Sequence, residues 1–163
     1  MKTKIGSTTK EILDSAQKYA NKSSGCLKVA VGCVIILRDS DRFHIYGCNK
    51  SMPLNCRTFG CRRVELYGED SKEHRLPSDC RALHAEIAAL TQAAWFGQPT
   101  YGATMYVTRY PCEACARAIV NAGIKHVYYG REQEISEETQ KIFHEGHVKV
   151  THVDNWYYAD TRR

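Results

Sequence analysis

Helical and extended patterns alternate along the chain from residue 82 to residue 153. Apolar residues recur at helical spacing after Ala82, and Gly97 closes that helix. Short strands are predicted at 104–108, 126–130 and 147–153, with helices between them that begin near Pro111 and after Ser136. Such alternation favours an α/β fold in which helices cover a layered sheet.

The N-terminal part of the chain predicts one more helix and two more strands. Thr8 and Glu11 have the spacing of a capping box, which opens a helix. We expect that helix to end near residues 23–25. Strands should follow at 29–37 and 43–48, with a polar turn at 38–41 between them.

Residues 49–79 show no regular pattern. Pro53, Gly60, Gly68 and Pro77 interrupt them, and charges of both signs crowd them. A long irregular segment inside a compact domain is uncommon and is often functional. Since 163 residues are about the length of one domain, we predict a single domain over residues 1–163 with a cysteine-rich insertion at about 49–80.

Charge and hydropathy exclude several classes of protein. No segment approaches the roughly 20 apolar residues that span a bilayer, so no membrane partner is expected. Basic residues near the N-terminus are followed by no apolar run, so no secretory leader is predicted. The net charge of +5 fits an anionic ligand, but the basic residues are scattered, which argues against nucleic acid as the partner.

Eight cysteines are many for a chain of this length. Without a secretory leader we expect a cytoplasmic protein, and cytoplasmic thiols stay reduced. Metal binding, catalysis or burial must therefore account for the cysteines. Cys33 and Cys48 fall within predicted strands and should be small core residues.

Cys112 and Cys115 stand three residues apart in the first turn of a predicted helix. Residues at that spacing share a helix face, so both sulfurs can reach one ion, and the helix N-terminus favours thiolates. His84, at the start of another helix, can supply a third ligand. Three protein ligands leave one position of a tetrahedral Zn²⁺ open for water, which is the catalytic arrangement.

Glu86 follows His84 by two residues. At that spacing its carboxylate should lie off the metal but near the bound water, where it can take a proton and pass it to a leaving group. A lone Cys-x-x-Cys or a lone His-x-Glu would be weak support for such a site. Their combination in the order His-x-Glu…Pro-Cys-x-x-Cys is the signature of zinc-dependent nucleobase deaminases.

The chain resembles the cytidine deaminase-like superfamily and, within it, the deoxycytidylate (dCMP) deaminases, including the bacterial late-competence ComE type. The resemblance covers roughly residues 26–153. The segments that carry it are residues 47–50, 80–86, 92–94, 102–108, 111–112 and 121–125. It implies a three-layer αβα sandwich around a mixed five-stranded sheet, hydrolysis of dCMP to dUMP and ammonia, and a homo-oligomer, either a dimer or a hexamer.

The resemblance also implies residues that bind the nucleotide. Asn49 would form a hydrogen bond near the sugar and the base. Lys50 stands where relatives carry glycine, and Arg109 and Tyr110 are atypical of the family. We expect Lys50 and Arg109 to bind phosphate and Tyr110 to stack on the base.

Four further cysteines, the loop cysteines, lie after the first helix and in or beside the irregular stretch: Cys26, Cys56, Cys61 and Cys80. A metal clip orders long loops, so we expect a second, structural zinc held by these four. Some relatives carry a second zinc in this region, with cysteines that match Cys26 and Cys56. His74 is a substitute ligand if one cysteine is not used, and the alternative is four buried free thiols.

Two other kinds of function stay open. One is deamination of tRNA adenosine, guanine or a free nucleoside, since Ala88 replaces the asparagine usual in dCMP deaminases and residues 84–90 are similar to tRNA adenosine deaminases. The chain lacks the concentrated basic tail that RNA binding favours. The other is a zinc-stabilised binding module without catalysis, and Glu86 argues against it because a structural site needs no proton shuttle.

Overall fold

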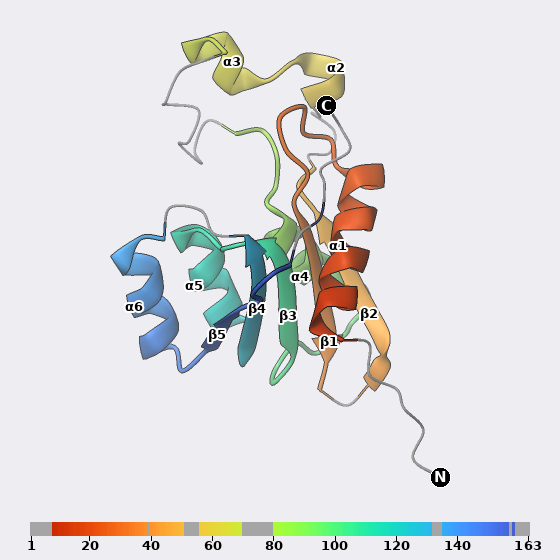
Figure 1. The fold of residues 1–163 in the computed structure, drawn as a ribbon, viewed down its shortest axis with the longest axis vertical. Coiled ribbons are helices and arrows are strands. Elements are labelled where there is room, and N and C mark those ends of the chain that lie inside the picture. The colour runs from red at the N-terminus through yellow and green to blue at the C-terminus, as the bar shows by residue number, and fades with distance from the viewer. Residues whose placement is uncertain are drawn as a thin grey trace.

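The computed structural model describes residues 8–38, 40–50, 56–69, 80–131, 135–156 and 158. None of the helices in these ranges is long and apolar enough to cross a membrane. The elements, labelled in Figure 1, are α1 (Thr9–Ser23), β1 (Gly32–Leu37), β2 (Ser40–Cys48), α2 (Cys56–Phe59), α3 (Arg62–Tyr67), α4 (Ala85–Trp95), β3 (Thr104–Arg109), α5 (Glu113–Asn121), β4 (His126–Arg131), α6 (Glu137–Glu145) and β5 (Lys149–His152).

The five strands form one mixed sheet in the order β2-β1-β3-β4-β5. β1 runs antiparallel to both β2 and β3, whereas β3, β4 and β5 are parallel to one another. The parallel pairs are joined through α5 and α6, as crossover connections require. The predicted mixed five-stranded sheet is therefore confirmed.

Helices cover both faces of this sheet. On one face Ile12 and Ala16 of α1 pack against Val34 of β1. On the other face α4, α5 and α6 join the larger core cluster, which includes Ala89 and Ile119. In Figure 1 α1 lies on one side of the sheet, and α5 and α6 lie on the other. The chain therefore has the three layers of the predicted αβα sandwich.

Two helices begin at the predicted capping residues, but β1 begins later than predicted. Thr8 and Glu11 form a capping box that opens α1, and Ser136 caps α6. β1 begins at Gly32, three residues later than expected. The side chain of Asn49 explains the difference, because it binds the carbonyl of Val29 and the amide of Val31.

Two short helices occupy part of the stretch that was predicted to be irregular. α2 and α3 have one and two turns, too few for the periodicity to stand out in the sequence. The guanidinium of Arg81 holds α3 in place through two contacts with Glu65, at 3.0 and 3.2 Å, and one with the carbonyl of Gly60 at 3.3 Å. These contacts connect Arg81, just after the insertion, to α3 in the middle of the insertion.

Candidate active site

Three predicted ligands converge between the starts of α4 and α5. The Nδ1 atom of His84 lies 3.5 Å from the sulfur of Cys112 and 3.5 Å from that of Cys115. All three ligand atoms lie within 4.8 Å of one another. Tetrahedral zinc with bonds of about 2.0–2.1 Å to nitrogen and 2.3 Å to sulfur separates such atoms by about 3.5 Å. The two nitrogen–sulfur distances therefore match those of a tetrahedral Zn²⁺ site.

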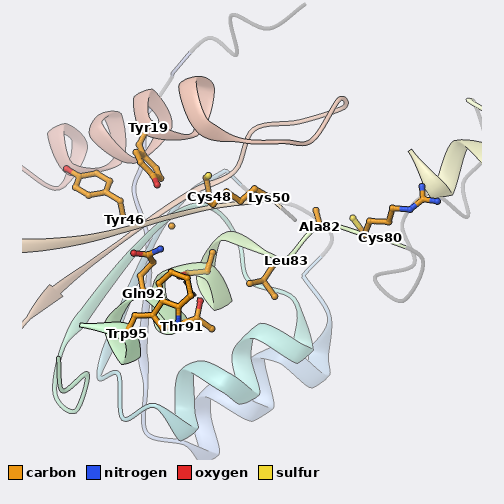
Figure 2. Close-up of a pocket in the computed structure, with 13 residues that line it drawn as sticks. Tyr19, Tyr46, Cys48, Lys50, Cys80, Ala82, Leu83, Thr91, Gln92 and Trp95 are labelled. Carbon is orange, nitrogen blue, oxygen red and sulfur yellow. Dashed lines mark hydrogen bonds between the residues drawn. The ribbon is translucent and has the colours of Figure 1, made fainter. Parts of the chain in front are cut away.

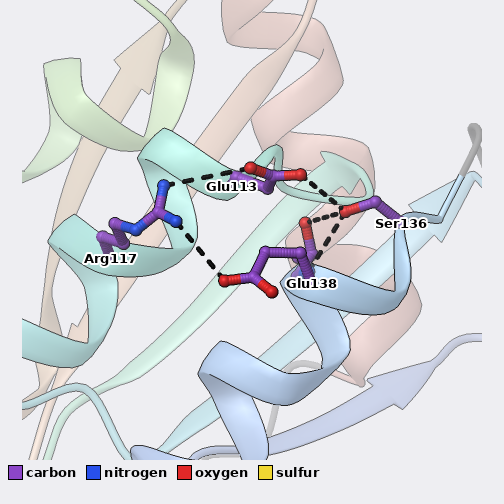
Figure 3. Close-up of polar contacts among 5 residues, drawn as sticks. Glu113, Arg117, Ser136 and Glu138 are labelled. Atoms are coloured by element: carbon purple, nitrogen blue, oxygen red, sulfur yellow. Dashed lines mark hydrogen bonds and ion pairs between the residues drawn. The ribbon is translucent and has the colours of Figure 1, made fainter.

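Helix starts hold these ligands in place. His84 is the N-cap of α4 and Cys112 is the N-cap of α5, one position earlier than predicted, while Cys115 lies in the first turn. Figure 3 shows how α5 is fastened there: the hydroxyl of Ser136 donates to Glu113 at 3.1 Å, and Arg117 pairs with Glu113 and Glu138. We infer that these contacts keep the start of α5 from fraying beside the ligands.

The two thiols share a proton unequally. Hydrogen bonds from Cys115 and from His84 lower the pKa of Cys112 to about 4, although burial opposes this. The pKa of Cys115 is raised because its thiol donates to Cys112 and is buried. A metal needs both sulfurs as thiolates, so its binding must release the remaining proton.

Glu86 is a buried carboxyl directly beside the ligands, with 4% of its surface exposed. Burial raises its pKa above the ordinary value, and its own backbone amide and the charge of His84 oppose that rise. The thiol of Cys115 lies within hydrogen-bonding reach of the carboxylate. A carboxyl with a raised pKa holds a proton more readily than an ordinary carboxylate, which suits a group that must accept a proton and then release it.

Asn49 is buried, and its side chain fastens the loop between α1 and β1. Its Oδ1 accepts hydrogen bonds from the hydroxyl of Ser24 and the amide of Val31, both at 2.8 Å, and its Nδ2 donates to the carbonyl of Val29 at 2.9 Å. Both amide orientation and loop shape are therefore fixed. The structure shows this scaffold role for Asn49, and the nucleotide contact stays a prediction.

Lys50 borders a groove of about 500 Å³ between α1, β2 and α4. In Figure 2 the rings of Tyr19 and Tyr46 lie on one side of this groove and Trp95 on the other. The backbone of Lys50 forms an isolated β-bridge with Leu83, next to His84. Lys50 therefore lies at the edge of the groove and beside the segment that carries His84.

Two predicted substrate contacts, Arg109 and Tyr110, come from the end of β3. Arg109 is half-buried and paired in register with Arg131 of β4. Tyr110 is 4% exposed, and its ring packs edge-on against Tyr129 and Phe143 in the core. This packing places the ring in the core, and the stacking of Tyr110 on a base stays a prediction.

The loop cysteines lie near one another, but their sulfur atoms do not form a group within metal-binding distance. Burial raises the pKa of Cys56, and the thiols of Cys26, Cys61 and Cys80 raise it further by charge repulsion. Among the described residues, only the group of His84 and its two cysteines has its ligand atoms within mutual metal-binding distance. His74, the substitute ligand, lies outside the described residues. Cys33 and Cys48 are fully buried core residues, as predicted.

Arg63 of α3 was missed by the sequence analysis. The hydrogen bond with Cys112 raises the pKa of His84, and the charge of Arg63 is among the influences that oppose this rise. The insertion has several arginines in irregular sequence, and no periodicity marks the one that faces inward. Its placement depends on how α3 is docked, which only the structure shows.

Comparison with solved structures supports the fold. The dCMP deaminase from the cyanophage S-TIM5, in complex with dCMP and dUMP, superposes with a TM-score of 0.66 at 24% identity, covering 94% of this chain and 99% of that one. At that identity the likeness concerns the fold.

Comparison with sequences identifies the family. ComE operon protein 2 of Bacillus subtilis is 35% identical over 133 residues, which are 80% of this chain and 64% of that protein. Deoxycytidylate deaminase of Saccharomyces cerevisiae is 32% identical over 133 residues, and the chain spans 40% of its length. The Mycobacterium phage D29 enzyme is 32% identical over 69% of this chain and 87% of its own. Residues 7–131 match the model of the cytidine and deoxycytidylate deaminase zinc-binding region, and the chain therefore belongs to this family.

Proposed function

We propose that the chain is a zinc-dependent hydrolase that converts dCMP and water to dUMP and ammonia. The observation that carries this proposal is the position of Glu86 beside a preassembled set of His84, Cys112 and Cys115. Three ligands leave a position for water, and the buried carboxyl lies next to it. Relatives named as deoxycytidylate deaminases give the substrate.

Each of these residues has a separate part in the proposed reaction. The three ligands hold zinc, which when bound supplies a Lewis acid that lowers the pKa of water toward neutrality. Glu86 takes one proton from that water at its carboxylate and passes it to N3 of the ring, and it then passes the second proton, from the C4 hydroxyl, to the C4 amine as the C–N bond breaks. Water thus supplies the C4 oxygen of dUMP, and the amine leaves as ammonia.

Residues near the ligands are proposed to bind the nucleotide. Nδ2 of Asn49 carries a second N–H besides the one that it donates to Val29, and we assign that group to the sugar. Lys50 and Arg109 are proposed to contact the phosphate, where charge-assisted hydrogen bonds are strongest.

A second, structural zinc held by the loop cysteines is part of this proposal. Besides burial, charge repulsion from the other three cysteines raises the pKa of Cys56, and this supports a common neighbourhood of the four thiols. A divalent cation would turn that repulsion into attraction, because it binds thiolates directly. Binding would draw the sulfurs together and order the loops that carry them.

The organisation of the whole protein is likewise proposed. One domain over residues 1–163 would contain the insertion at about 49–80, and the protein would work in the cytoplasm as a homo-oligomer, a dimer or a hexamer. Trp95 and Phe96 at the end of α4 are 83% and 59% exposed. Large exposed rings of this kind favour contact with another protein surface.

The proposal is tested by offering substrates in parallel to the zinc-loaded protein. The change in ultraviolet absorbance is followed with dCMP, CMP, dCTP, deoxycytidine and guanine, and inosine is measured in an RNA hairpin. We expect the highest kcat/KM with dCMP and equal amounts of dUMP and ammonia. A higher value with another of these substrates would reassign the enzyme within its family, and turnover of none would favour a binding module.

A further inference from the structure

Two buried glycines lie side by side in the sheet, and each lets a helix pack directly on the backbone of a strand. Gly32 of β1 pairs with Cys48, and Cys33 pairs with Gly47 of β2. Because successive residues of a strand face opposite sides of a sheet, the two glycines face different helices. A methyl group at Gly32 would lie 2.1 Å from the carbonyl oxygen of Ala16 in α1.

Gly47 faces α4 and meets it at its beginning. A methyl group at Gly47 would lie 2.3 Å from the carbonyl oxygen of Ala85 and 2.4 Å from the amide nitrogen of Ala89. In an α-helix the amide of residue 89 donates to the carbonyl of residue 85, so the methyl group would strike one of the first hydrogen bonds of α4. Ordinary van der Waals contact begins at 3.4 Å, so β2 and α4 would have to separate by about 1 Å from the 2.3 Å contact.

The residues of the candidate active site lie on this same turn of α4. Ala85 stands between Glu86 and His84, the N-cap of the helix. Nδ1 of His84 is the ligand atom that meets the sulfurs of Cys112 and Cys115. Those two residues come from α5, so the position of the first turn of α4 decides whether the three ligand atoms meet.

The end of β2 is held firmly where it passes α4. Asn49, two residues after Gly47, donates its amide to the carbonyl of Val31 at 3.1 Å, and its Oδ1 accepts from the amide of Val31 at 2.8 Å. The carbonyl of Lys50 accepts from the amide of Leu83 at 3.1 Å, which ties β2 to the residue before the metal ligand. A displacement at Gly47 would therefore fall mainly on the start of α4.

A metal site tolerates little displacement of its ligands. Distances from a metal to its ligands vary by only about 0.2 Å around their usual values. Misplacement of a reacting group by roughly 1 Å can lower a rate by about 100-fold. Close packing at Gly47 is therefore fine enough to affect both zinc binding and proton transfer by Glu86.

We propose that Gly47 is a positioning residue for the deamination reaction. Because it has no side chain, β2 packs directly on the first turn of α4, and the bridge between Lys50 and Leu83 continues this contact. The packing sets His84 and Glu86 at their distances from the ligands on α5. This inference rests on the zinc site and the reaction proposed above. It gives the edge strand β2 a part in catalysis, although it supplies none of the three ligands.

The test compares Gly47→Ala with Gly32→Ala, which presses the same methyl group against α1 on the other face. Both changes should lower the melting temperature. In Gly47→Ala the affinity for zinc, measured by competition with a chelator, should fall roughly 10- to 100-fold. The kcat of its zinc-loaded form with dCMP should fall about 100-fold. In Gly32→Ala the zinc affinity and kcat should stay close to the wild-type values.

Leu83→Pro tests the same packing without a clash. It removes the amide hydrogen that binds the carbonyl of Lys50, and it places no bulk between β2 and α4. The affinity for zinc should fall by roughly tenfold. This variant decides the matter if Gly47→Ala does not fold, and wild-type zinc affinity in it would then refute the inference.

The outcomes separate this inference from the proposed function. If wild type binds zinc and deaminates dCMP, and Gly47→Ala does both equally well, the role of Gly47 is refuted and the deaminase proposal stands. Equal losses of zinc affinity in Gly47→Ala and Gly32→Ala would also refute it, because general loss of stability would then explain them. If wild type binds no zinc at His84, Cys112 and Cys115, the proposed function fails and the inference fails with it.

Discussion

Two groups of cysteines lie in this molecule, and they differ in what holds them. Cys112 and Cys115 stand at the start of α5, and their sulfurs lie 3.5 Å from the same histidine nitrogen. The loop cysteines come from four separate places between residues 26 and 80, three of them in or beside the insertion. Neighbouring groups lower the pKa of Cys112 and raise that of Cys56.

The first group belongs to a preassembled metal site, whereas the loop cysteines would form a site only when a metal binds. Helix starts and core packing fix the first group, so its geometry already fits zinc before an ion binds. At the second group, burial and the neighbouring thiols disfavour the thiolate form of Cys56, and a cation would reverse this by binding thiolates. We expect the first site to lose function without zinc, and the second to lose structure, because binding there is coupled to folding.

Cys115→Ala should have the largest effect of the changes considered. It removes one of three ligands from the preassembled site, so the catalytic zinc and the deaminase activity should both be lost. Metal analysis of the purified variant should give one zinc per chain fewer than wild type, with the loop site still filled. Full zinc content with normal turnover would show that Cys115 is not a ligand.

Glu86→Gln should separate metal binding from chemistry at the same site. Removal of a positioned proton shuttle commonly lowers the rate by about 10²–10⁴-fold. Zinc content and melting temperature should stay close to the wild-type values, since the amide has the same shape as the buried carboxyl. Activity within tenfold of wild type would contradict the role given to Glu86.

Cys56→Ala should remove the second metal and lower stability. We expect one zinc per chain fewer than wild type and a fall in melting temperature of more than several degrees, given that 1 kcal/mol is worth about 2–4 °C in a domain of this size. Cys48→Ala is the control, because this residue is equally a cysteine but lies in the core. It should lower the melting temperature through a cavity and leave the zinc content unchanged. Equal zinc content in Cys56→Ala and wild type would remove the second site.

Alkylation of the zinc-stripped protein should show the smallest of these effects. It compares how the reaction rates of Cys112 and Cys56 depend on pH. With a pKa of about 4, Cys112 is a thiolate throughout pH 6–8, so the rate at which it is alkylated should hardly change with pH. The pKa of Cys56 is raised above its usual range, so its rate should rise about tenfold per pH unit. Mass spectrometry of the modified peptides measures both rates in one sample. A parallel rise at both residues would mean that the environments do not differ.

The same contrast explains how much could be predicted from the sequence. The helices that begin at Thr9 and Glu137 have caps visible as residue patterns, and the ligands at residues 84, 112 and 115 lie at fixed spacings from helix starts. Such features depend on neighbours along the chain, so they can be recognised without a structure. The mixed order of the strands was expected only from the family resemblance.

Features set by long-range packing could not be predicted. Tyr110 precedes the Pro-Cys-x-x-Cys motif and looked accessible, but the rings of Tyr129 and Phe143 enclose it. Asn49 was predicted to contact the nucleotide, and its neighbours in the chain do not show that its amide fastens the loop that leads into β1. The docking of α3 through the pairing of Arg81 with Glu65 depends on residues that lie 16 positions apart. None of these contacts follows from local sequence.

Anomalous diffraction at the zinc edge, from crystals of the zinc-loaded protein, tests the account most directly. It should show a peak about 2.0–2.1 Å from Nδ1 of His84 and about 2.3 Å from the sulfurs of Cys112 and Cys115, with a water as the fourth ligand. The carboxylate of Glu86 should lie beside that water and not on the metal. No peak between these three residues, or a fourth protein ligand that closes the site, would contradict the catalytic role proposed for it.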